Sequence, residues 1–175
     1  MLKKIIFLIL VSFFLQSCED KFSTIYKAQI TVNNNRPNTA DTVLYDSINH
    51  FKFSRLNKID VSGITSTFVL PKEHQNKALW VIFSGRARTD YAHSNSSITT
   101  AAMSEKNECL VWRAVFLRYF YTDINKWCYF KDSIYLRPDF DGKVYNEISS
   151  FAFSGSSSNE KFDIDTLNIQ IKAKI

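Results

Sequence analysis

The stretch FDIDTLNIQIKAK, residues 162–174, decides the fold class of this 175-residue chain. From Leu167 onward apolar and polar residues alternate, which is the period-two pattern of a strand with one buried face. Phe162 and Ile164 follow the same alternation with the opposite parity. A β-bulge near Asp165 would return all of these apolar side chains to one face, so we predict a long, bulged strand.

Alternation of this kind predicts strands along most of the chain. Residues 110–121 are apolar on both faces, which indicates a central strand, and residues 127–136 are expected to return as its hairpin partner. No convincing amphipathic helix follows residue 18. The strands predicted before residue 162 cover residues 25–32, 43–53, 64–70, 78–89, 98–103, 110–121, 127–136 and 143–153.

Composition supports the same fold class. The chain contains 15 Phe and 8 Tyr but only 4 Gly and 3 Pro, and aromatic residues favour the pleated surface of a sheet. We therefore predict an all-β fold, an antiparallel β-sandwich of eight to nine strands.

From Trp80 to the C-terminus the chain resembles the galactose-binding-like jelly roll of many carbohydrate-binding modules. The resemblance rests on LWVIF at residues 79–83 with Arg86, on Trp127 with Phe130, and on residues 162–169. Members often close with an adjacent pair of aspartates, which is split here by Ile164. The resemblance implies a jelly-roll sandwich that binds glycan and commonly holds a structural calcium ion. An immunoglobulin-like sandwich is the alternative.

The N-terminus has the order of a secretory signal: two lysines, an apolar run over residues 5–15, and LQSC at residues 15–18. The run is shorter than the ~20 residues that span a bilayer. LQSC resembles the lipobox of bacterial lipoproteins, which implies cleavage before Cys18, diacylglycerol on its thiol and an acylated amino terminus, commonly with palmitate. The alternative is ordinary secretory cleavage.

These features predict a signal peptide over residues 1–17, a tether over residues 18–24 and the sandwich over residues 25–175. We expect a lipid-anchored protein of the bacterial outer membrane that faces the periplasm or the cell surface. The charged residues 19–21 resemble a surface-export tag, and a solvated tether explains them equally well.

Net charge does not favour nucleic acid as a partner. The chain carries +5, and loss of Lys3 and Lys4 with the signal leaves +3. No helix or stripe gathers the cations, which is the pattern of a soluble surface. The expected partners are the membrane, through the lipid, and a glycan or an envelope protein.

Flat aromatic faces beside polar groups are what sugar binding requires. Trp80, Arg86 and Arg88 are predicted to share one strand face, and Trp112 and Tyr119 are further candidates. The alternative is that the aromatic residues fill the sandwich core.

Asp163 and Asp165 are candidate calcium ligands, because carboxylate oxygens suit that hard cation. The alternative is a pair of solvent-facing carboxylates at the start of a strand. Otherwise no cofactor is expected.

Catalysis is not expected. His93 and Asp90 lie in a serine-rich loop, but no nucleophile elbow or glycine-rich oxyanion loop accompanies them. Cys109 and Cys128 are either bridged or two small core residues. The leading hypothesis is a noncatalytic, glycan-binding lipoprotein. A subunit of an envelope complex is the second, and a hydrolase is a distant third.

Overall fold

A computed structural model describes residues 21–32, 42–57, 62–138, 142–155 and 160–175. Within these ranges the chain forms the predicted antiparallel β-sandwich, with ten strands rather than eight or nine. The strands are β1 (Phe22–Thr31), β2 (Thr42–Asp46), β3 (Phe51–Leu56), β4 (Ser62–Val69), β5 (Leu79–Thr89), β6 (Ser97–Met103), β7 (Cys109–Phe116), β8 (Cys128–Leu136), β9 (Glu147–Phe153) and β10 (Phe162–Lys174). Two short 3₁₀ turns, η1 (Lys72–His74) and η2 (Leu117–Tyr119), complete them.

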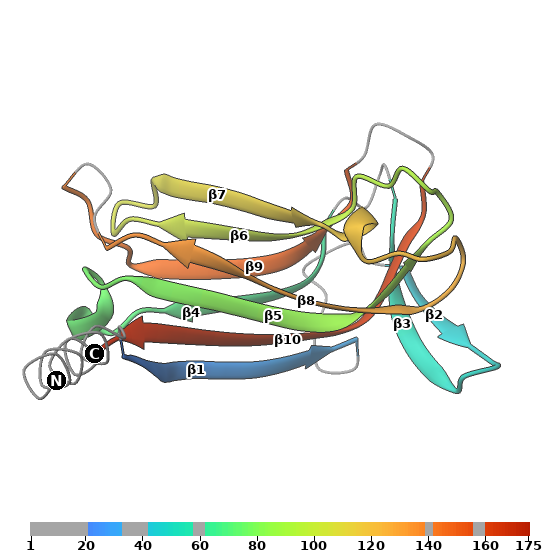
Figure 1. Cartoon of the computed structure of the whole chain (residues 1–175), viewed down its shortest axis with the longest axis horizontal. Helices are drawn as coiled ribbons and strands as arrows, with labels where there is room; N and C mark the ends of the chain where they lie inside the picture. Colours follow the sequence, from blue (N-terminus) through green and yellow to red (C-terminus); the bar gives the residue numbers. More distant parts are fainter. Residues whose placement is uncertain (1–20, 33–41, 58–61, 139–141, 156–159) are drawn as a thin grey trace, which may run out of the picture.

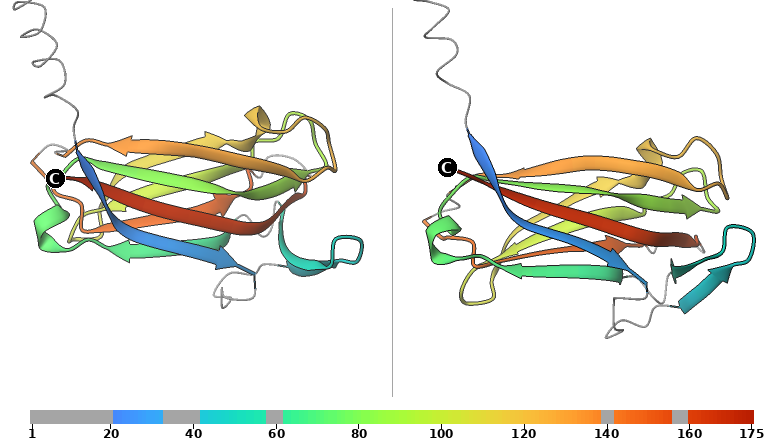
Figure 2. Two further views of the ribbon diagram at one scale, coloured as in Figure 1. Left: turned by 60° about the horizontal axis from the view of Figure 1, so that its bottom comes forward. Right: turned by 90° about the horizontal axis from the view of Figure 1, so that it is seen from below.

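Two sheets face each other across the core (Figure 1 and Figure 2). The six-stranded sheet has the order β2-β3-β10-β5-β8, and β1 pairs with β10 along the edge that β3 leaves free. The four-stranded sheet has the order β4-β9-β6-β7. The β2–β3 hairpin projects at one end of the sandwich (Figure 1).

β10 organises the larger sheet, because it pairs with β5 on one side and with β1 and β3 on the other. The predicted bulge is confirmed: the register with β5 shifts between Ile164 and Thr166. The shift lets Ile164 and Leu167 both face the core, where each is fully buried. The same shift turns Asp165 into a largely buried position at the bend.

The core consists of the inward-facing side chains of both sheets. Alternation along β5 is complete, since every second residue from Leu79 to Thr89 is buried. Burial of the large apolar side chains among them, Leu79, Val81 and Phe83, contributes roughly 1.5–3 kcal/mol each, which is why the alternating pattern specifies the fold so strongly. The largest fully buried side chains include Tyr145, Phe83, Phe162, Leu56, Ile64, Leu70, Leu79, Ile98 and Ile148.

The predicted strand over residues 43–53 is wrong, because the structure breaks it into β2 and β3. Asp46 Oδ1 accepts the backbone N–H groups of Ile48 and Asn49, at 3.0 Å each, which closes a tight turn. His50 completes the turn in the left-handed region, with φ 58°. The local hydrogen bonds of an aspartate side chain thus win over continued extension.

The predicted hairpin between residues 110–121 and 127–136 is also wrong. β7 pairs with β6 as an edge of the four-stranded sheet, whereas β8 pairs with β5 at an edge of the six-stranded sheet. β7 is apolar on both faces for another reason: Val111 and Val115 pack against the core, while Trp112 packs against Phe151 on the outer face, with ring centroids 5.4 Å apart.

The sandwich begins earlier than predicted. β1 starts at Phe22, within the stretch interpreted as a tether, and Ile175 donates its N–H to the Lys21 carbonyl at 2.9 Å. Cys18 and the charged residues 19 and 20 lie outside the described residues. Among the residues that the structure describes, none belongs to a helix long and apolar enough to span a bilayer.

Cys109 and Cys128 are free thiols on strands of different sheets. Cys109 is exposed, so the interpretation as a core residue is wrong for it, while Cys128 is half-buried. Burial raises the pKa of the Cys128 thiol to about 11, despite backbone hydrogen bonds that act in the opposite direction.

We expect maleimide to modify Cys109 rapidly in the native protein at pH 7.5 and Cys128 at least tenfold more slowly, because the thiolate is the reactive form. Mass spectrometry of the Cys109→Ser and Cys128→Ser variants assigns each rate. Equal rates at the two sites, or resistance of both until a reductant is added, would contradict this arrangement.

Candidate groove on the six-stranded sheet

The outer face of the six-stranded sheet is a grid, because four of its strands pair along their length, with one shift of register in β1 between Thr24 and Tyr26. Across β1, β10, β5 and β8, outward-facing residues align in transverse rows. The two central rows, here called the polar rows, are Lys27–Gln170–Ile82–Ser133 and Gln29–Asn168–Ser84–Lys131. The flanking end rows are Thr24–Lys172–Trp80–Tyr135 and Thr31–Thr166–Arg86–Tyr129.

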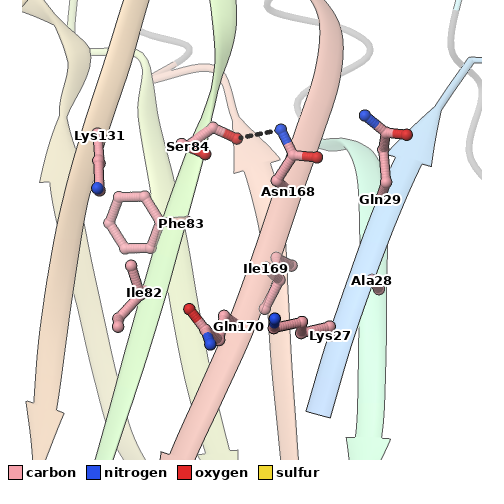
Figure 3. A pocket seen from close by; sticks show the side chains of 10 residues that line it. All are labelled: Lys27, Ala28, Gln29, Ile82, Phe83, Ser84, Lys131, Asn168, Ile169 and Gln170. Atoms are coloured by element: carbon pink, nitrogen blue, oxygen red, sulfur yellow. Dashed lines mark hydrogen bonds between the residues drawn. The ribbon is translucent and has the colours of Figure 1, made fainter. Parts of the chain in front are cut away.

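The polar rows form an open groove over the sheet (Figure 3). Two adjoining hollows of about 480 and 520 Å³ share Gln29, Ser84, Lys131 and Asn168 as lining residues. Asn168 Nδ2 donates to the Ser84 carbonyl at 3.4 Å, which holds one carboxamide across two strands. A carboxamide can donate and accept at once, so the groove offers both kinds of hydrogen bond to a ligand.

Aromatic side chains stand at both ends of the groove. Trp80 packs against Tyr135 with ring centroids 5.0 Å apart, and Tyr129, which is 79% exposed, stands in the other end row. Six residues along a strand separate the two end rows, a distance of about 20 Å. The groove is therefore long enough for an extended ligand, with a ring at each end.

One buried acceptor at the groove has no partner. Asp165 is 7% exposed, lines the second hollow, and its Oδ2 accepts from Arg86 Nε at 2.9 Å and from Arg86 Nη2. Its Oδ1 has no hydrogen bond with any described residue. A buried carboxylate oxygen left without a hydrogen bond costs free energy.

At the Arg86 end of the groove lies a cluster of ion pairs, here called the arginine cluster, that joins Arg55, Arg86 and Arg88 to Asp46, Asp163 and Asp165. Asp163, which is 3% exposed, accepts from Arg55 Nε at 2.7 Å, Arg55 Nη2 at 2.8 Å and Arg88 Nε at 2.8 Å. The hydrogen bonds that Arg55 donates to Asp163 raise the pKa of the Arg55 guanidinium. Each cation in the cluster thus has a carboxylate partner, and the arrangement joins β3, β5 and β10.

Aromatic rings cover the same guanidinium groups. Arg86 lies 4.0 Å from the Phe51 ring centroid, and Arg88 lies 4.7 Å from that of Trp127 and 4.9 Å from that of Phe53. Cation–π contacts at such distances are attractive. The arginine cluster therefore fastens the β2–β3 hairpin to the larger sheet.

The predicted ligand residues are not brought together. Trp80, Arg86 and Arg88 share one sheet face as predicted, but Arg86 and Arg88 are committed to aspartates. Trp112 is 56% exposed on the opposite sheet, so it neither fills the core nor reaches the groove. Tyr119 lies in η2 and is 74% exposed.

The calcium site stays a prediction. Arginine guanidinium groups lie against both Asp163 and Asp165, where a cation would have to bind. Among the described residues, no three His, Cys, Asp or Glu side chains are placed to hold a metal ion.

The serine-rich loop contacts the carboxylate of Glu160, and His93 takes no part in these contacts. Ser94 and Ser96 are fully buried, and Ser94 Oγ donates to Glu160, whose other oxygen accepts the Asn95 N–H at 3.3 Å. His93 is exposed and packs edge-on against Tyr91. This network braces the loop and does not have the arrangement of a catalytic triad.

Sequence reasoning missed most residues of the groove, namely Lys27, Gln29, Ser84, Tyr129, Lys131, Asn168 and Gln170. Each is an ordinary outward position of a strand. The one available signal was the run of polar residues on the face opposite the apolar residues of 167–174. Which residues of other strands lie beside that run depends on strand order.

Asp46 makes the hairpin sensitive to acid. The backbone and side chain of Asn49, and Trp127 Nε1 at 3.1 Å, hold the pKa of Asp46 well below its usual range. A carboxyl group whose pKa is lowered by folding stabilises the fold at pH values above its ordinary pKa of about 4. That stabilisation is lost as the pH falls toward the pKa of the folded state.

We therefore expect Asp46→Asn to lower the melting temperature at pH 7 and to lower it progressively less from pH 4 to pH 2. Melting curves of both proteins across this range measure the gap. Asp123→Asn is the control, since Asp123 pairs with Lys126 in an exposed site. A gap that stays constant to pH 2 would contradict the assignment.

No protein-family model and no curated protein matches the sequence. Solved structures are similar in fold at low identity. The structure of infectious bursal disease virus, Gx strain, is 8% identical over 89% of this chain and 32% of that chain, with TM-score 0.49. The CBM22-1 xylan-binding domain of Paenibacillus barcinonensis Xyn10C is 10% identical over 90% and 98%, with TM-score 0.46.

A family 6 carbohydrate-binding module is 14% identical over 80% of this chain and 90% of that chain, with TM-score 0.42. This chain covers only 32% of the Gx-strain chain, and 38% of the chain in the crystal structure of the infectious bursal disease virus VP2 subviral particle. The neighbours thus include carbohydrate-binding modules with a jelly-roll fold, and the likeness concerns fold alone.

Proposed function

We propose that this protein is a noncatalytic, lipid-anchored envelope protein that binds an extended glycan in the groove of its six-stranded sheet. The observation that carries the proposal is the grid itself: two polar rows between aromatic end rows, on one continuous face. Carboxamides and hydroxyls match sugar hydroxyls, and exposed rings match the apolar face of a pyranose.

The groove is open along its length, which suits an internal segment of a chain better than a small compact ligand. Attachment through Cys18 would place the groove at the outer membrane, facing the periplasm or the cell surface.

The test is a glycan array probed with the full chain in mild detergent, followed by calorimetry on the best ligand. We expect Tyr129→Ala and Trp80→Ala each to weaken binding about tenfold, because aromatic anchors carry a large share of binding energy. Tyr45→Ala is the matched control, since Tyr45 is 57% exposed on β2 outside the groove. Saturable binding that both groove variants leave intact would refute the site.

Anchorage has its own test. Mass spectrometry of the mature protein should find three acyl chains on an N-terminal Cys18, and Cys18→Ser should release the protein from membranes. A mature form that lacks lipid would refute the anchor without bearing on the groove.

A second candidate function is docking of an envelope protein on the outer face of the four-stranded sheet. The observation that favours it is an aromatic patch of Trp112, Phe151 and Phe153, whose rings pack edge to face. Exposed aromatic patches are common at protein interfaces. A photoreactive residue at position 112 should cross-link one envelope protein in cells, whereas the same residue at position 45 should not.

A further inference from the structure

The groove carries positive charge that nothing in the described structure neutralises. Lys27 and Lys131 stand in the two polar rows, on the outer strands β1 and β8, and Lys172 stands in the Trp80 end row. No aspartate or glutamate occupies the four rows. None of the three lysines forms an ion pair with a carboxylate of the described residues.

The placement of two of these lysines directs their charge over the groove. β10 and β5 lie between β1 and β8. Lys27 and Lys131 therefore flank the groove, about 14 Å apart across the strands. Figure 3 shows the Lys27 side chain reaching from β1 over β10, beside Gln170. Lys131 belongs to the lining of both hollows.

The arginine cluster provides an internal contrast. There, Arg55, Arg86 and Arg88 each contact an aspartate within the same sheet, and Asp163 and Asp165 are both more than nine-tenths buried. The cations that hold strands of this sheet together are thus neutralised by buried aspartates. The groove lysines lack that neutralisation, although they lie on the same face one to three rows away.

We infer that the glycan bound in this groove is anionic, with carboxylate or sulfate groups that contact Lys27 and Lys131. This inference rests on the proposed function and narrows its ligand class. Each ammonium offers up to three donors to such a group, while the carboxamides between them take the neutral hydroxyls. Attraction over this distance falls as salt is added, because the Debye length is about 10 Å at 0.1 M.

The experiment compares the full chain with a Lys27→Gln/Lys131→Gln variant on matched polymers. The probes are polygalacturonate with its methyl ester, and dextran sulfate with dextran, together with an array of neutral glycans. Lys106→Gln is the control, since it removes one positive charge by the same substitution from the exposed β6–β7 turn, outside the groove. Thermal melting establishes that each variant is folded.

We expect an anionic polymer to bind at least tenfold more tightly than its neutral counterpart, and the double variant to lose at least tenfold while the Lys106 variant loses little. The polygalacturonate pair reports on carboxylate and the dextran pair on sulfate. Binding should also weaken between 0.05 and 0.5 M NaCl.

Equal binding of neutral and anionic glycans, or an unaffected double variant, would overturn the charge assignment and leave the groove standing. If Tyr129→Ala loses binding while the double variant binds normally, the groove is the binding site but its lysines do not contact the ligand. Failure of every glycan to bind would overturn the proposed function, and this inference with it.

Discussion

Gly85→Ala is expected to lower the free energy of unfolding by about 3 kcal/mol, at the upper end of what overpacking a core costs. A Cβ at position 85 would lie 2.2 Å from the Thr166 carbonyl oxygen and 2.6 Å from Phe130 Cζ. The oxygen belongs to the backbone of β10 beside the bulge, so it moves only if the central pair of strands separates. Urea titration followed by circular dichroism measures the loss.

Gly63→Ala is the matched control, because its Cβ would meet only the side chain of Leu56, at 2.8 Å from Cδ1. A leucine side chain can rotate away, so we expect a cost of about 1 kcal/mol or less. If Gly85→Ala unfolds at the same urea concentration as the wild-type protein, β5 and β10 are not as close as described. Should the variant be recovered only as insoluble protein, refolding yield against Gly63→Ala gives the comparison.

Asp163→Asn is expected to cost about 3 kcal/mol, at the lower end of the range for breaking a buried ion pair. The carboxylate is 3% exposed and serves two guanidinium groups: Arg55 loses its ion pair, whereas Arg88 keeps its contact with Asp46 Oδ2 at 3.5 Å. The cost is not greater because the side chains of Arg55 and Arg88 are 28% and 23% exposed, so water can take up part of the charge.

Asp123→Asn is again the control, because it removes a carboxylate from an exposed ion pair, Asp123–Lys126. Exposed pairs contribute roughly 0–1 kcal/mol, so the two substitutions should differ by about 2 kcal/mol or more in urea titrations. If they cost the same, the arginine cluster does not hold the β2–β3 hairpin in place. The hairpin should also become the first segment to exchange its amide hydrogens in Asp163→Asn.

How far the sequence predicts this fold depends on the reach of each signal. Residues 162–174 predicted both the long strand and its bulge, because the alternation of apolar and polar residues, and its change of phase, can be seen within the segment itself. The alternation over residues 78–89 likewise predicted the buried and exposed faces of β5. Where the prediction failed, at residues 43–53, a side-chain hydrogen bond from Asp46 redirected the chain against its strand propensity.

The pairing of strands was less predictable. β7 was expected to be central and is an edge strand, because an apolar outer face can be covered by aromatic neighbours such as Phe151 instead of by a second layer. Residues 110–121 and 127–136 were expected to pair as a hairpin, yet β7 and β8 belong to different sheets. Both errors arise because pairing depends on residues far apart in the chain.

By itself, the sequence determined that this protein is an all-β sandwich. The period-two pattern of each strand is a local feature, and burial of its apolar face stabilises each strand in the same way. The sequence also marked Trp80, Arg86 and Arg88 as one face, because residues two apart on a strand always share one. Only the tertiary structure decided that Arg86 and Arg88 are neutralised by aspartates some 75 to 79 residues away, and that Lys27 and Lys131 are not. The groove is made of such long-range neighbours, so strand order and register, rather than any motif, place its polar rows side by side.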